Sequence, residues 1–164
     1  MKLSKFKNRG FTLLFAVLIA GVLLSVALAI FSQMYKSLLL SSASKESLAA
    51  FYAADSGIEC ALYWDLKHEP LTSFSDSIFP NLNNPSGVVN TDIKCNGQNF
   101  TNGWTPGGTN PITTEFNLLF TDTGGCTKVK VSKGETSTTI ESRGYNICDA
   151  SSPRKLERAV RVTY

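Results

Sequence analysis

The chain has few of the residues from which catalytic and metal sites are built. His68 is the single histidine among 164 residues, so no second histidine is available for a catalytic triad. Placed two residues before Pro70, it suggests a helix cap or a surface group. The four cysteines form no CxxC pair, which argues against a zinc site. The sequence therefore predicts a protein that is not an enzyme and that holds no cofactor and no metal.

Phosphate and calcium loops are also missing from the sequence. Gly107-Gly108 and Gly124-Gly125 are not followed by the Lys-Ser or Lys-Thr pair of a phosphate-binding loop. The acidic residues are too scattered for a calcium loop, which needs several carboxylates within one short segment. We therefore expect neither a nucleotide site nor a calcium site.

Charge is scarce and unevenly placed. No acidic residue occurs before Glu46, whereas four cations, Lys2, Lys5, Lys7 and Arg9, stand at the start. Without these four, the 16 basic residues fall to 12 against 13 acidic ones, so the net charge changes from +3 to −1. Net charge therefore gives no indication of nucleic-acid binding. The cations before the apolar run predict a cytoplasmic N-terminus, with everything after about Phe31 outside.

An uncharged apolar run follows these cations, from Phe11 to Phe31, with Thr12 and Ser25 as its only polar residues. Roughly 20 apolar residues at about 1.5 Å each make a helix of about 30 Å, which is enough to cross a bilayer. We therefore predict a transmembrane helix over residues 11–34.

The junction between the cations and the apolar run, Lys-Asn-Arg-Gly-Phe-Thr-Leu-Leu at residues 7–14, resembles the class III leader of type IV pilins and type II secretion pseudopilins. The resemblance implies that prepilin peptidase removes residues 1–10 by cutting after Gly10, and that Phe11 becomes the methylated first residue. An uncleaved signal anchor remains an alternative. A conventional signal cleaved near the small residues 41–44 is another.

One position departs from the pattern of that family. Major pilins carry a glutamate five places into the mature chain, where it pairs with the amino terminus of a neighbouring subunit; here the position is Phe15. Absence of the acid resembles PilX-type minor pilins and the tip pseudopilin. The departure favours a minor subunit, for which the filament tip is one candidate position, over a bulk one.

The helix is expected to continue outside the membrane over residues 35–67 and to end before Pro70. Phe51, Ala54, Ile58 and Ala61 form an apolar stripe at helical spacing, while Asp55, Glu59 and Asp65 fall mostly off it. Asp55 and Glu59 belong either to a solvated face or to a subunit contact. Gly21 and Gly57 are expected to be points where the helix could bend. Residues 51–61 also resemble the corresponding helix segment of PilX-like proteins.

Residues 68–164 are predicted to form a loop region rich in Pro, Gly and Asn, followed by an antiparallel sheet. One short strand is expected near Val88 to Cys95. Phe100 and Trp104 are either exposed contacts or core residues, and Asn99-Phe-Thr is read as a chance glycosylation motif. Strict alternation, as in Phe116, Leu118 and Phe120, predicts four or five strands on the helix.

The predicted fold class is thus α+β, with one long helix on an antiparallel sheet. Cys60, Cys95, Cys126 and Cys148 fall on the exported side, where disulfides persist. Three pairings are possible, and we prefer Cys60–Cys95 with Cys126–Cys148.

The resemblance implies a minor pilin or pseudopilin in a type IV pilus or a secretion filament, acting in assembly, adhesion, DNA uptake or secretion. Its partners would be prepilin peptidase, other subunits through the helix, and the membrane. The implied location is the cytoplasmic membrane in a single pass, and then the cell surface. A signal-anchored extracellular binding module is the main alternative, and an anchored exported enzyme is a weaker one.

Overall fold

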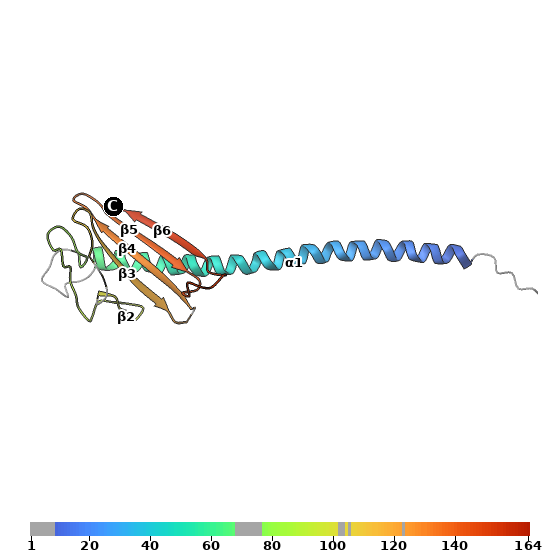
Figure 1. Ribbon diagram of the computed structural model, residues 1–164, viewed down its shortest axis with the longest axis horizontal. Coiled ribbons are helices and arrows are strands. Elements are labelled where there is room, and N and C mark those ends of the chain that lie inside the picture. The colour runs from blue at the N-terminus through green and yellow to red at the C-terminus, as the bar shows by residue number, and fades with distance from the viewer. Residues whose placement is uncertain (1–8, 68–76, 102–103, 105, 123) are drawn as a thin grey trace, which may run out of the picture. The chain divides into compact units, whose positions relative to one another are not determined.

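The computed structural model describes residues 9–67, 77–101, 104, 106–122 and 124–164, without the side chains of residues 9 and 10. The chain divides into two compact units, Met1–Ala43 and Ser44–Tyr164. Helix α1 (Arg9–Leu62) runs through the boundary and is followed by a short π-helical turn, η1 (Tyr63–Lys67) (Figure 1). The helix predicted to end before Pro70 is therefore confirmed as helical up to Lys67.

In the first unit, the described chain is helical from Arg9 to Ala43, and every side chain from Phe11 to Ala43 is exposed. The helix is long and apolar enough to cross a membrane. No charged residue lies between Arg9 and Lys36. This part of the chain therefore has the properties of a single membrane span or a signal anchor.

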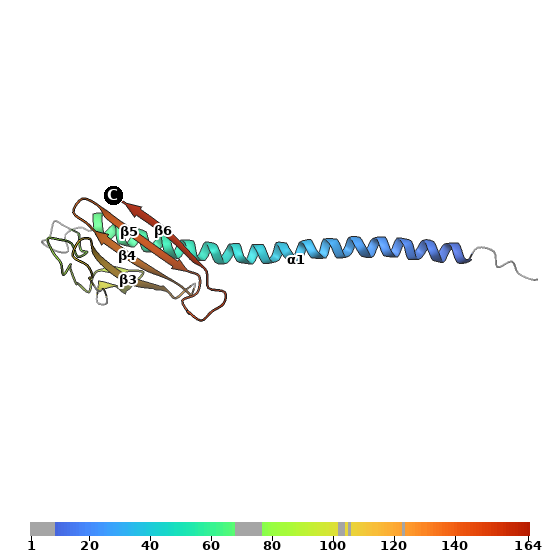
Figure 2. The ribbon, with the colours of Figure 1, turned by 45° about the horizontal axis from the view of Figure 1, so that its top comes forward.

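The second unit contains four antiparallel strands in the order β3-β4-β5-β6. Their bounds are Ile112–Phe120, Gly125–Lys133, Thr138–Tyr145 and Glu157–Thr163. One face of this sheet packs on the part of α1 that belongs to the second unit (Figure 2). The α+β class and the four-stranded sheet are confirmed, and the alternating residues Phe116, Leu118, Val129 and Val131 are buried as expected.

A second, two-stranded sheet pairs β1 (Lys94–Cys95) with β2 (Gln98–Asn99). The strand expected near Val88 to Cys95 is therefore mostly wrong, since only its last two residues are extended in a sheet. Asparagines explain the difference. The Asn90 side chain accepts a hydrogen bond from the backbone amide of Asp92 at 3.0 Å. The Asn99 side chain donates hydrogen bonds to the backbone carbonyls of Asn90 and Ile93. Such bonds favour turns over strands.

Small residues line the contact between helix and sheet. Ala50 and Ala54 are fully buried on α1, opposite Gly144 of β5. A Cβ atom on Gly144 would collide with the carbonyl oxygen of Ala50 and the amide nitrogen of Ala54. Gly57, further along α1, also allows the helix to approach the sheet closely, because a Cβ atom there would collide with the hydroxyl of Ser142. Gly57 is thus a point of close approach, which the expectation of a bend did not foresee.

The predicted apolar stripe is right for Ala54, Ile58 and Ala61 and wrong for Phe51, which is 43% exposed. The sheet approaches the helix through Gly144, so the buried face at this level consists of alanines. A phenylalanine has no room in so close a contact and lies at its edge.

The core is richest in aromatic side chains where the loop region packs against β3. Phe100 stacks on Phe116 with ring centroids 4.4 Å apart, and Phe79 lies 5.6 Å from Trp104. Phe100 and Trp104 are buried, so they are core residues, and the alternative of exposed contacts is wrong.

Both disulfides lie in the second unit. Cys60 of α1 pairs with Cys95 of β1, and Cys126 of β4 pairs with Cys148, with Cα separations of 6.0 and 5.6 Å. This is the preferred pairing of the sequence analysis. The first disulfide ties the helix to the loop region that precedes the main sheet.

Candidate functional site

The predicted processing position lies at the start of α1. Gly10 is the second residue of the helix, and the Phe11 side chain is 74% exposed. Phe15, the position that departs from major pilins, is 57% exposed one turn later. The lysines of the leader lie outside the described residues. The structure therefore brings Phe11 and Phe15 onto one uncharged helix surface but does not test cleavage after Gly10.

The helix of the first unit is apolar on all sides. Its exposed large side chains run from Phe11 to Leu40 with no interruption by charge before Lys36. A helix that is apolar all round is stable only when lipid or other apolar helices surround it. This surface is the most extensive functional feature of the described chain.

Apolar side chains are also exposed on α1 and η1 in the second unit, and two of them, Leu48 and Tyr52, line a hollow together with Phe120 of β3. Leu48, Phe51, Tyr52, Tyr63 and Leu66 are each at least 43% exposed. Asp55, half-buried, and Glu59, exposed, lie between them. A solvated face explains the two acids. The exposed apolar and aromatic side chains around them are instead typical of a surface that contacts another molecule.

A buried carboxylate stands where α1 ends. The Asp65 side chain has no exposed surface and forms a salt bridge with Lys133, whose Nζ lies 2.6 Å from Oδ1 of Asp65. The hydroxyls of Ser77 and Tyr164 also donate to it. Burial and the hydrogen bond to Asp65 raise the pKa of Tyr164 well above its usual value. This cluster joins η1, the end of β4 and the residue after β6.

The sequence prediction groups Asp65 with acids that lie mostly off the apolar stripe, and for Asp65 this is wrong, because its side chain is fully buried. A usable signal was present, because Asp65 follows Ile58 and Ala61 at steps of three and four and so continues the buried stripe. A carboxylate on an apolar stripe requires a cation nearby. Lys133, far away in sequence, could not be identified as that cation before the sheet was known.

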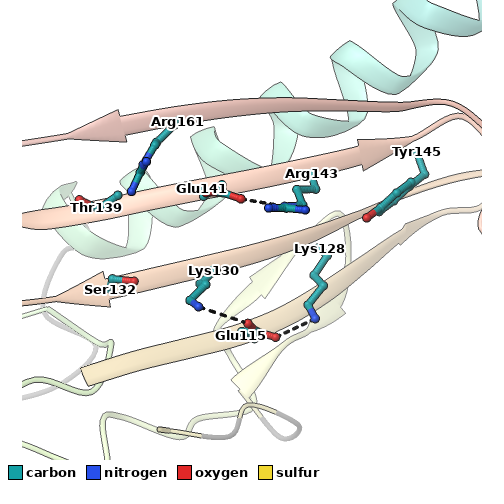
Figure 3. Close-up of a pocket in the computed structure, with 9 residues that line it drawn as sticks. All are labelled: Glu115, Lys128, Lys130, Ser132, Thr139, Glu141, Arg143, Tyr145 and Arg161. Atoms are coloured by element: carbon teal, nitrogen blue, oxygen red, sulfur yellow. Dashed lines mark hydrogen bonds and ion pairs between the residues drawn. The ribbon is translucent and has the colours of Figure 1, made fainter. Parts of the chain in front are cut away.

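The second polar site is the solvent face of the main sheet, on the side opposite α1 (Figure 3). A depression of about 440 Å³ lies over its four strands. Strand register arranges the outward side chains in rows that cross the sheet. In one row Lys128 lies directly opposite Arg143, and in the next Glu115, Lys130, Glu141 and Arg161 alternate in sign. We call these the cation row and the alternating row.

A third row contains hydroxyl groups without charge: Thr113, Ser132, Thr139 and Thr163. Tyr145 borders the cation row on its other side and packs under Lys155, whose Nζ lies 4.3 Å from the ring centroid. The face thus combines cations, hydroxyls and one aromatic ring within one depression.

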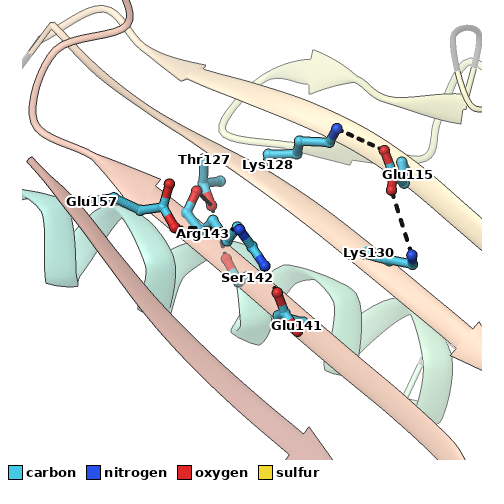
Figure 4. A network of polar contacts seen from close by, with 8 residues as sticks. All are labelled: Glu115, Thr127, Lys128, Lys130, Glu141, Ser142, Arg143 and Glu157. Carbon is cyan, nitrogen blue, oxygen red and sulfur yellow. Dashed lines mark hydrogen bonds and ion pairs between the residues drawn. The ribbon is translucent and has the colours of Figure 1, made fainter. Parts of the chain in front are cut away.

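The acids of this face hold individual cations. Glu115 binds Lys128 at 2.7 Å and Lys130 at 3.8 Å. Arg143 binds Glu141 at 2.7 Å and Glu157 of β6 at 3.5 Å (Figure 4). The hydrogen bond from Lys128 lowers the pKa of Glu115, and the bond to Glu141 raises that of Arg143. Among the described residues, Arg161 makes no ion pair.

The remaining residues that the sequence analysis singled out form no site among the residues that the structure describes. His68 lies outside the described residues, and no group of three or more His, Cys, Asp or Glu that could hold a metal occurs among the described residues. The Asn99 side chain is engaged with two backbone carbonyls, which agrees with reading its glycosylation motif as chance.

Comparison with known proteins gives no match: no family model, no curated protein and no solved structure is similar to this chain.

Proposed function

We propose that this protein is a minor pilin or pseudopilin, a subunit of a type IV pilus or of a filament like that of type II secretion. In this proposal residues 1–10 are a leader on the cytoplasmic side, residues 11–34 span the membrane, and the sheet-bearing unit lies outside. Prepilin peptidase and other filament subunits are the expected partners.

The observation that carries the proposal is the uniformly apolar, fully exposed helix surface that begins at Phe11, directly after a basic leader ending in Gly10. A conventional signal would be lost with its apolar core. A cut after Gly10 would instead leave the apolar helix attached to the folded unit. The α+β fold and the apolar residues exposed on α1 and η1 of the second unit are compatible with this role.

The mechanism is physical and involves no chemical step at the chain's own residues. The processed protein waits in the membrane as an anchored monomer, with lipid covering the helix. On assembly, lipid contacts are exchanged for contacts with the apolar helices of neighbouring subunits, and van der Waals packing stabilises the bundle. Because Phe15 cannot supply the carboxylate of a major pilin, we assign the subunit a minor position, such as the tip.

The test is the amino terminus of the mature protein, determined by mass spectrometry after expression with prepilin peptidase. We expect a start at N-methylated Phe11. Gly10→Val should block processing, because a branched side chain crowds the bond to be cut. Gly21→Val is the matched control and should be processed normally, since no heavy atom lies within 4 Å of the position of a Cβ on Gly21.

An intact leader on the exported protein, or a start near residues 41–44, would contradict the proposal. An intact leader would favour the signal-anchored binding module. A start near residues 41–44 would mean that the apolar helix is discarded.

A further inference from the structure

The solvent face of the sheet has an arrangement of charge that folding alone does not call for. Lys128 and Arg143 are directly opposite each other on neighbouring strands, a position in which like charges destabilise a sheet. Each needs an acid from an adjacent row to offset this repulsion. A simple exchange of one residue would have removed the conflict, so the cation row suggests an anion outside the protein.

The lining of the depression is cationic on balance. Lys128, Lys130, Arg143 and Arg161 line it together with two acids, Glu115 and Glu141. Glu157 at the margin adds a third acid, through its contact with Arg143. The acids therefore leave a small positive excess, and Arg161 is the cation of this face that no ion pair engages within the described residues.

The neighbouring hydroxyl row narrows the chemistry of the ligand. A phosphodiester chain presents an anion at every unit, and the acids of the alternating row would repel it. A chain that carries both hydroxyls and spaced carboxylates fits better. Arginine and lysine would bind its carboxylates, while Glu115, Glu141, Ser132 and Thr139 would exchange hydrogen bonds with its hydroxyls. Tyr145 offers an aromatic face at the edge of the same depression.

We propose that the solvent face of the β3-β4-β5-β6 sheet binds an acidic polysaccharide. Its principal carboxylate contact is the guanidinium of Arg161, which forms no ion pair with any residue that the structure describes. Lys130 and Arg161 lie two strands apart in the alternating row, about 10 Å by the usual strand spacing. The chain would therefore cross the strands along the rows. This inference is independent of the filament role and holds equally for an anchored binding module.

The test uses the full-length protein in detergent, with hyaluronate, which carries a carboxylate on every second sugar unit, as the probe and neutral dextran as the reference polymer. We expect binding to hyaluronate that weakens as salt is raised, and no binding to dextran. Arg161→Gln should weaken binding about tenfold, the effect of losing one charge-assisted contact.

Arg158→Gln is the matched control, because it removes the same charge from the same strand on the other face. Arg158 lies opposite Gly144, and its Nε donates to Ser47 of α1 at 2.8 Å. The affinity of the Arg158→Gln protein for the acidic polysaccharide should stay within about twofold of that of the parent protein. Glu115→Gln should act in the opposite direction and tighten binding, since it frees Lys128 and Lys130.

Equal losses for Arg161→Gln and Arg158→Gln would show a non-specific charge effect and overturn the assignment. The proposal also fails if duplex DNA binds more tightly than hyaluronate and shows the same dependence on Arg161, because the ligand would then be a phosphodiester. Circular dichroism of each variant establishes that its fold is retained. Failure here would leave cleavage after Gly10 untouched, so the two proposals are tested separately.

Discussion

At the scale of single residues, Asp65 illustrates how one polar group can fix the end of a long helix. Its carboxylate is fully buried and receives Lys133, Ser77 and Tyr164 from three separate segments. Such a pair adds little net stability over an apolar substitute, but breaking it leaves a buried charge without compensation. The cluster therefore ties η1, the turn that follows α1, to the end of β4 and to Tyr164.

Replacing Asp65 with asparagine should lower the free energy of unfolding by about 3 to 5 kcal/mol, because the ammonium group of Lys133, whose side chain is only 12% exposed, would lose its counter-charge. Thermal or denaturant unfolding of the full chain in detergent, followed by circular dichroism, measures the change. The control is Asp55→Asn, on the same helix at a half-buried position, for which we expect a change within about 0.5 kcal/mol. Similar effects at both positions would mean that Asp65 is not the anchoring group.

At the scale of elements, the contact between α1 and β5 depends on the lack of side chains. Gly144 meets backbone atoms of the helix, and the carbonyl carbon of Ala53 would lie 2.9 Å from a Cβ placed there. Backbone atoms of a packed helix cannot move aside as the end of a flexible side chain can. The helix and the sheet must therefore separate if Gly144 is enlarged.

We expect Gly144→Ala to destabilise the second unit by about 1 to 3 kcal/mol or more, as overpacking does. Gly107→Ala provides the comparison, because the nearest heavy atom to its Cβ position is Thr113 Oγ1 at 3.4 Å, an ordinary contact. Its effect on the unfolding midpoint should be small. A Gly144→Ala protein as stable as the parent would show that the interface is more open than described.

At the scale of the whole molecule, the chain combines an anchor that is apolar on every side with a folded unit of mixed polarity. Each part has its own requirement: the first needs lipid or other helices, and the second is closed by its own core and two disulfides. A filament subunit satisfies both requirements. On this proposal, Phe15 decides where in the filament the subunit is placed.

Phe15→Glu should increase incorporation along the filament shaft, if the missing acid alone excludes the subunit from bulk positions. A carboxylate within the apolar bundle is stable only with a cationic partner, which the amino terminus of a neighbour would provide. Quantitative immunolabelling of isolated filaments measures the amount and position of the variant. Leu14→Glu, with an acid one place away, should gain nothing. If Phe15→Glu stays at trace levels in an unchanged position, the explanation is wrong.

The sequence by itself determined the long helix and the α+β fold with four or five antiparallel strands, whereas the choice among three disulfide pairings came from the structure. These features depend on local signals: an uncharged run from Phe11, alternation such as Phe116 and Leu118, and turn residues between strands. Only the tertiary structure decided that Asp65 is buried, that Phe51 is exposed and that Gly57 and Gly144 are contact points. It alone set Lys128 opposite Arg143, because strand register and the choice of helix face depend on partners far away in sequence.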